Sequence, residues 1–146
     1  MFRNSIKFIY SNVNNLARKD IQNIRNLHDS RTTLYAFKQQ SPVTLRNLYD
    51  LGKNINAKTK IMIAQFAHQE IAIRIAKRVN ELQKLPYGLS KSPHINDLIR
   101  LYENSFIELA DLSEIDNEEK AINLKDVFSS IKEKNKRVNI IMSQGI

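Results

Sequence analysis

Polar side chains interrupt the apolar stripes of this 146-residue sequence at three positions where chemistry could occur. His68, Ser105 and Asn135 each fall at helical spacing among aliphatic residues, and the hydroxyl of Tyr102 lies close to Ser105 in the sequence. Buried polar groups need hydrogen-bond partners. These residues therefore either fix the register of packed helices through satisfied hydrogen bonds, or line a polar pocket inside a helical bundle.

The residues that several other chemistries require do not occur in suitable patterns. Gly52, Gly88 and Gly145 are far apart, whereas a phosphate-binding loop needs clustered glycines whose N–H groups can approach the phosphates. The chain contains no cysteine, and its histidines share no metal-ligand spacing with carboxylates. We therefore predict no catalytic residue, no metal site and no cofactor for this chain.

The element that must position the polar residues is a long helix over residues 57–85. This stretch contains neither proline nor glycine, and Leu85-Pro86-Tyr87-Gly88 ends it with a turn. Its apolar face recurs at steps of three and four, which fits an α-helix and no strand. That face comprises Ile61, Ala64, His68, Ile71, Ile75, Arg78 or Val79, and Leu82.

The rest of the chain is predicted to form helices that pack around this one. Residues 21–40 are weakly helical, and Ser41-Pro42 is a helix start that predicts a short helix ending at Gly52. Ser92-Pro93 opens a helix to Leu112, an acidic connector follows, and a regular three-four pattern over 121–142 predicts the last helix. The predicted fold class is all-α, a four-helix bundle with an additional short helix.

The net charge of +8 is unevenly distributed, with +5 over residues 1–40, +6 over 41–91 and −3 over 92–146. No basic cluster is interleaved with aromatic residues, and no apolar run has the length of a transmembrane helix. We therefore expect no nucleic-acid or membrane partner. Residues 1–19 are basic, amphipathic and free of acidic groups, which predicts a mitochondrial presequence; the alternative is an ordinary first helix.

Several segments resemble the N-terminal helical domain of the mitochondrial pyruvate dehydrogenase kinase and branched-chain 2-oxoacid dehydrogenase kinase family. The resemblance covers roughly residues 34–146. It rests on Ser41-Pro42-Val43-Thr44-Leu45-Arg46 through Asp50-Leu51-Gly52, Gln69-Glu70-Ile71-Ala72-Ile73-Arg74-Ile75-Ala76, Leu85-Pro86-Tyr87-Gly88-Leu89-Ser90, Pro93, Tyr102, Ser105-Phe106 and Ser143-Gln144-Gly145-Ile146. The family's helix proline is replaced by Ala72, which should straighten the long helix.

The resemblance implies a serine/threonine protein kinase family of the mitochondrial matrix, which phosphorylates and inactivates the decarboxylase component of a pyruvate or branched-chain complex. In that family an ATP-binding domain follows, and its asparagine box and glycine-rich lid do not occur in this sequence. We therefore expect a truncated or partial member, with a presequence at 1–19 and the helical domain at 20–146. It should be inactive alone and monomeric, with ATP and Mg²⁺ needed only by the absent domain.

The resemblance also implies two binding sites. Tyr35, Phe37 and Leu51 would dock the lipoyl group on the lipoyl domain of the complex's acyltransferase core, the alternative being a satellite of the core. A pocket for a small 2-oxoacid regulator would be lined by Ile75, Tyr102, Ser105, Ile131, Lys132 and Asn135. Lys132 replaces a family arginine and lacks its bidentate fork, and Asn135 replaces a histidine.

Two further classes of protein compete with this interpretation. Phe66-Ala67-His68-Gln69-Glu70 is weakly similar to the phosphoacceptor helix of two-component histidine kinases, although the acidic residue expected after the histidine is Gln69. The chain could also be a stand-alone helical adaptor that is unrelated to kinases.

Overall fold

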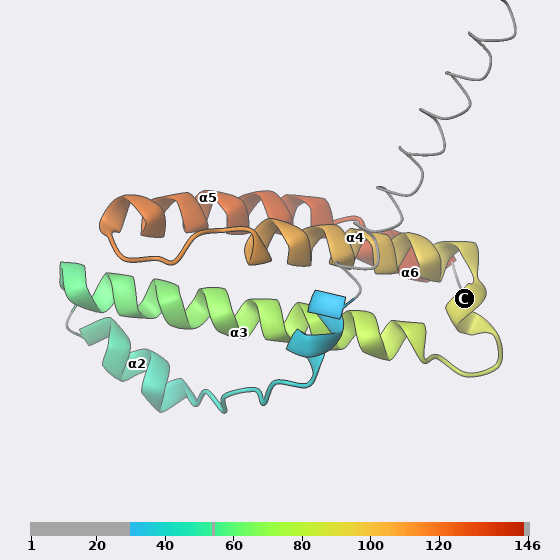
Figure 1. Cartoon of the computed structure of the whole chain (residues 1–146), viewed down its shortest axis with the longest axis horizontal. Helices are drawn as coiled ribbons and strands as arrows, with labels where there is room; N and C mark the ends of the chain where they lie inside the picture. Colours follow the sequence, from blue (N-terminus) through green and yellow to red (C-terminus); the bar gives the residue numbers. More distant parts are fainter. Residues whose placement is uncertain (1–29, 54, 145–146) are drawn as a thin grey trace, which may run out of the picture. The chain divides into compact units, whose positions relative to one another are not determined.

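The structure, a computed structural model, describes residues 30–53 and 55–144, and residues Thr32–Ile146 form one compact unit. Every regular element in the described ranges is a helix (Figure 1), which confirms the all-α prediction. The predicted presequence at 1–19 lies outside the described residues. None of the described helices is long and apolar enough to be a membrane span.

The long helix α3 spans Ala57–Gln83 without interruption, so it begins where predicted and ends two residues before the predicted end at Leu85. Asn56 caps its start, because the side-chain oxygen accepts a 2.8 Å hydrogen bond from the Thr59 N–H. The helix is also continuous through Ala72, where a proline would have removed one backbone hydrogen bond. Beyond its end the chain turns at Tyr87 and Gly88, which both have positive φ angles.

Helix α4 (Pro93–Ala110) runs back along α3, and α5 (Glu118–Asn135) then returns in the direction of α3 (Figure 1). Proline occupies the start of α4, and the Asn117 side chain caps α5. The three helices enclose the main core, which is built from Ala72, Ile75, Ala76, Phe106, Leu109, Leu124 and Ile131 together with Ala36 and Ile115. A second cluster joins the C-terminal half of α3 to the N-terminal half of α4, through Val79, Leu82, Ile95, Leu98 and Ile99.

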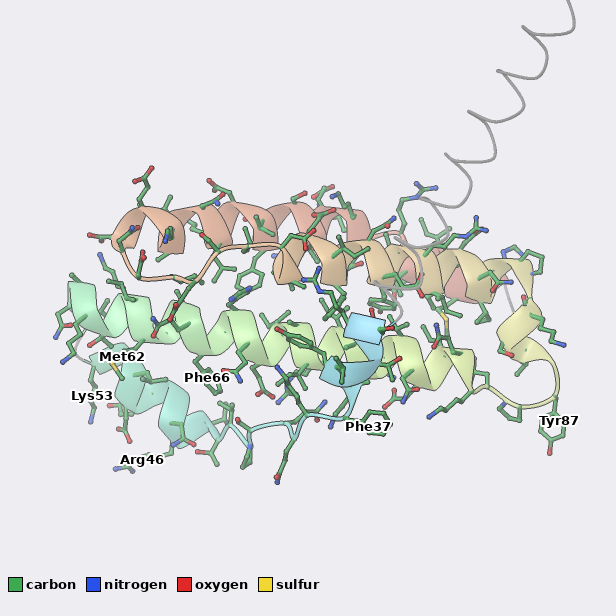
Figure 2. The ribbon with its side chains drawn as sticks, in the orientation of Figure 1. Phe37, Arg46, Lys53, Met62, Phe66 and Tyr87 are labelled. Carbon is green, nitrogen blue, oxygen red and sulfur yellow. The ribbon has the colours of Figure 1, made fainter. Side chains whose placement is uncertain are left out.

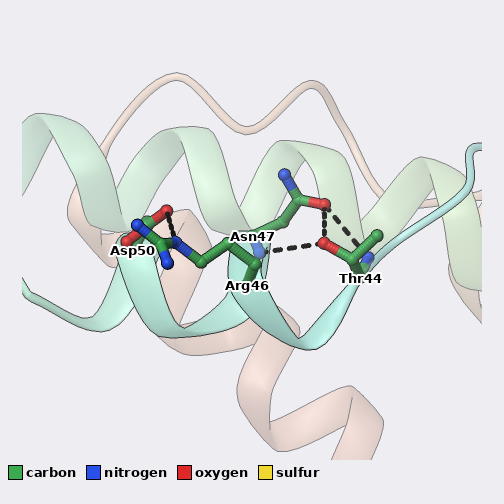
Figure 3. A network of polar contacts seen from close by, with 4 residues as sticks. All are labelled: Thr44, Arg46, Asn47 and Asp50. Carbon is green, nitrogen blue, oxygen red and sulfur yellow. Dashed lines mark hydrogen bonds and ion pairs between the residues drawn. The ribbon is translucent and has the colours of Figure 1, made fainter.

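The short helix α2 spans Leu45–Lys53, so the prediction that it begins at Ser41-Pro42 is wrong. Thr44 caps it instead: its hydroxyl accepts a hydrogen bond from the Asn47 N–H, and the Asn47 side chain in return accepts from the Thr44 N–H (Figure 3). Arg46 and Asp50 pair one turn apart on the same helix (Figure 3). Ser41 lies outside α2, which begins four residues later, and the Ser41 N–H donates to Glu70 of α3.

Two other predicted helices end earlier than their patterns suggested. The helical stretch at 30–36 stops before Phe37, so the predicted helix does not reach Gln40. The predicted helix over 121–142 is divided, since α5 ends at Asn135 and α6 spans Val138–Gln144. At this break i→i+3 bonds replace the α-helical ladder, with the N–H of Lys136 donating to the Glu133 carbonyl.

Candidate functional site

A cavity of about 330 Å³ opens between the N-terminal half of α3 and the chain from Pro42 to Leu51. Its lining is almost entirely apolar: Pro42, Val43 and Leu51 on one side and Met62, Ile63 and Phe66 on α3, with Asn47 supplying the polar group. Figure 2 shows Met62 and Phe66 projecting from α3 on the side where α2 lies. Both side chains remain exposed, so the cavity is accessible from solvent.

Helical spacing explains why α3 presents these residues together. Met62, Phe66, Glu70 and Arg74 follow one another at intervals of four, which places them in one row along the helix surface. We refer to these four residues as the α3 ridge. Its first two members contribute apolar surface to the cavity, and its last two form an ion pair with an N–O distance of 2.9 Å.

Of the predicted docking residues Tyr35, Phe37 and Leu51, only Leu51 lines this cavity. The Tyr35 ring packs edge-on against Phe106 of the main core, with a centroid distance of 5.2 Å. Phe37 is exposed and points away from α3 (Figure 2). Sequence reasoning missed Met62, Phe66, Glu70 and Arg74 as site residues, although their regular spacing of four could have identified the ridge.

The residues predicted to line the small-carboxylate pocket occupy different surroundings. Ile75 and Ile131 are buried in the main core, and Tyr102 is partly buried and packs against that core. The Ser105 hydroxyl is buried and donates to the Leu101 carbonyl one turn earlier, at 2.9 Å. Lys132 is exposed and lines a separate groove between α3 and α5. The pocket stays a prediction.

Asn135 carries a buried side-chain oxygen, the one buried side-chain polar atom without a hydrogen-bond partner in the described part of the chain. A carbonyl oxygen needs a donor, which an ionised carboxylate cannot supply. In this amide orientation, the buried oxygen of Asn135 requires a ligand group that donates a hydrogen bond.

His68 is hydrogen-bonded through Nε2 to the Leu109 carbonyl at 2.7 Å. This bond ties α3 to the C-terminal end of α4, which is the register-fixing role rather than that of a free phosphoacceptor.

The groove that Lys132 lines has a volume of about 690 Å³, and its apolar lining includes Ala64, Ala67 and Phe128. Among the described residues, no group of three or more side chains has the types and proximity to hold a metal ion.

Comparison with known proteins gives the candidate site its context. A sequence family described as mitochondrial branched-chain alpha-ketoacid dehydrogenase kinase matches residues 42–146. The chain is 31% identical over 108 residues to the mitochondrial [pyruvate dehydrogenase (acetyl-transferring)] kinase of Arabidopsis thaliana, covering 74% of this chain and 30% of that protein. Human isozyme 1 is 31% identical over 116 residues, with 77% and 26% covered. Rat isozyme 4 is 27% identical over 115 residues, with 77% and 27% covered. The chain therefore spans less than a third of the length of these relatives.

Proposed function

This chain belongs to the mitochondrial branched-chain alpha-ketoacid dehydrogenase kinase family, and from that membership we propose that its helical unit docks a lipoyl domain of a 2-oxoacid dehydrogenase complex. The cavity between α2 and α3 would receive the lipoyl group. In the whole protein, docking would bring the kinase to the dehydrogenase that it phosphorylates. The relatives are named mitochondrial proteins, which confirms the predicted mitochondrial location.

The shape and lining of the cavity support this proposal most directly. A lipoyl group on a lysine side chain is a long, narrow and largely apolar arm that ends in two sulfur atoms. A volume of about 330 Å³ lies within the range of roughly 300–1,000 Å³ typical of small-molecule sites. The polarizable thioether of Met62 and the ring of Phe66 are suitable contacts for the dithiolane sulfurs.

The polar and charged groups near the cavity fit a protein-borne ligand. Asn47 lies in the lining and could hydrogen-bond the amide that links a lipoyl group to its lysine. Residues 41–91 carry a net charge of +6. This excess of positive charge favours a partner domain with acidic groups around its lipoyl-lysine, because complementary charge steers association.

The experiment compares one lipoyl domain with and without its lipoyl group by calorimetry against the full chain. The lipoylated form should bind at least about tenfold more tightly, since burial of two methylene groups alone contributes about 1.6 kcal/mol. Phe66→Ala should abolish most of that difference, whereas Tyr87→Ala, which removes an exposed aromatic far from the cavity, should leave it intact. Equal affinities for the two forms in the unmodified chain would refute the docking proposal.

We also propose that this chain contributes docking rather than phosphotransfer. Gly52 lies in the last turn of α2 and Gly88 in the loop after α3, so neither belongs to a glycine cluster that could approach phosphates. The full chain should therefore give no heat of ATP binding in calorimetry. Micromolar affinity for ATP would contradict this part of the proposal.

A further inference from the structure

Glu70 is a buried carboxylate in the middle of α3, with 6% of its surface exposed. Both of its oxygens accept hydrogen bonds from the Ser41 N–H, at 3.2 and 3.1 Å. Oε1 also accepts from Arg74, at 3.0 Å from Nε and 2.9 Å from a terminal guanidinium nitrogen. A buried carboxylate is costly unless it is paired and hydrogen-bonded, and these contacts meet both requirements.

Arg74 closes the arrangement by donating to the Ser41 carbonyl at 3.4 Å. The ion pair on α3 thus holds both the N–H and the C=O of a single residue, which lies 29 positions earlier in the chain. Ser41 precedes Pro42, so its backbone is already restricted to extended conformations. Fixing its two polar groups therefore fixes the direction in which the chain continues into Pro42 and Val43.

The ion pair between Arg78 and Glu81 on the same helix shows how unusual this arrangement is. That pair also has an N–O distance of 2.9 Å, yet its side chains are 60% and 61% exposed. Exposed pairs of this kind contribute little to stability and position nothing. Glu70 differs from Glu81 in being buried and in binding a distant backbone.

We propose that Glu70 and Arg74 are positioning residues for the docking cavity, because they hold the Ser41 backbone and so place the cavity wall formed by Pro42 and Val43. The α3 ridge then has two tasks along one row of side chains. Met62 and Phe66 form one wall of the cavity, while Glu70 and Arg74, one and two turns farther along, anchor the segment that forms the opposite wall. This inference rests on the proposed docking function for its purpose, but its geometry can be tested without a partner.

The test uses Glu70→Gln in the full chain, with Glu81→Gln as the matched control on the same helix. NMR of the free protein would follow hydrogen exchange of the Ser41 amide and the methyl chemical shifts of Val43. Glu70→Gln should accelerate exchange at Ser41 by about tenfold or more, since hydrogen bonds to charged groups are the strong ones. The methyl shifts of Val43 should change, while exchange at Ser105 and Leu109 in α4 stays unchanged. Glu81→Gln should alter none of these signals.

A second variant keeps the test decisive if Glu70→Gln does not fold. Arg74→Lys retains the positive charge but loses the fork that reaches Glu70 and Ser41 together. It should accelerate exchange at Ser41 about threefold, a smaller effect than that of Glu70→Gln, because the carboxylate still accepts from Ser41. Affinity for a lipoylated domain should also fall in both variants, and the loss should be larger in Glu70→Gln than in Arg74→Lys.

Two results would overturn the inference. One is retention of Ser41 protection and of the Val43 methyl shifts in both variants. The other is a uniform loss of protection across α3, α4 and α5, which would make the ion pair a general stabiliser of the bundle. If the unmodified chain does not distinguish lipoylated from unlipoylated domain, docking fails, and the NMR measurements still decide whether Glu70 and Arg74 position the 41–43 segment.

Discussion

The α3–α4 interface and helix α2 are built on opposite principles. Across the interface, apolar residues of both helices are buried, with Phe106 at 1% exposure. In α2, the apolar residues Leu45, Tyr49 and Leu51 remain exposed, and the helix is organised by a capping box and an ion pair. The comparison separates a region that supplies stability from one whose apolar surface is left available for binding.

The largest expected effect is in the interface. Phe106→Ala should lower the free energy of unfolding by about 3–5 kcal/mol, because it removes a fully buried ring and leaves a cavity. Leu45→Ala in α2 is the control and should change stability by less than about 0.5 kcal/mol. Urea unfolding monitored by circular dichroism measures both. Similar losses from the two variants would remove the distinction between the regions.

A smaller effect of opposite sign is expected at Asn135, where α5 ends. Asn135→Leu should raise the free energy of unfolding by about 1 kcal/mol, since it removes a buried oxygen that lacks a partner. Thermal unfolding of the full chain provides the measurement. A loss of stability instead would show that the amide has a structural partner, and the bundle would then depend on polar contacts as α2 does.

The capping box of α2 provides the next prediction. Thr44→Ala should destabilise this helix by about 1 kcal/mol, because the Asn47 N–H loses its acceptor. The effect should appear as faster hydrogen exchange within α2 and not in the midpoint of global unfolding. Ser113→Ala, an exposed change in the connector between α4 and α5, is the control and should alter neither. A lower global midpoint would show that α2 is part of the cooperative core.

The smallest effect concerns Asp116 in the connector before α5. The hydrogen bond from Lys120 lowers the pKa of the Asp116 carboxyl below its usual 3.8. A lowered pKa means that the ionised form favours the folded state, so its contribution is present at neutral pH and is lost as pH falls below about 4. Asp116→Asn should therefore reduce the acid dependence of stability slightly, as measured by urea unfolding at pH 7 and pH 3. An unchanged pH dependence would contradict the prediction.

Much of the bundle could be predicted from sequence because its determinants are local. Three-four spacing identified α3, and Ser92-Pro93 marked the start of α4. The start of α2 could not be predicted in this way. Ser41-Pro42 has the composition of a helix start, but Glu70, which is distant in sequence, binds the Ser41 N–H.

The candidate sites were harder to predict, for geometric reasons. Ile131 and Asn135 lie one turn apart on α5, whereas Lys132 is rotated by about 100° from Ile131 and faces the groove toward α3. A sequence motif shows which residues are neighbours along the chain, but it does not show in which direction each side chain points. The division between α5 and α6 was also invisible, because the apolar period continues across Lys136 and Arg137 while the backbone bonding changes.

Ala72 and Ala76 have an evolutionary consequence. Both alanines are almost completely buried in the main core, with Phe106 and Leu109 as fellow members. At position 76, which is fully buried, an added methyl or larger group would overpack the core, at a typical cost of about 1–3 kcal/mol. The exposed apolar residues of α2 carry no such constraint from folding. Descendants of this sequence should therefore keep a small residue at 76, while changes in α2 remain open to selection for a different partner.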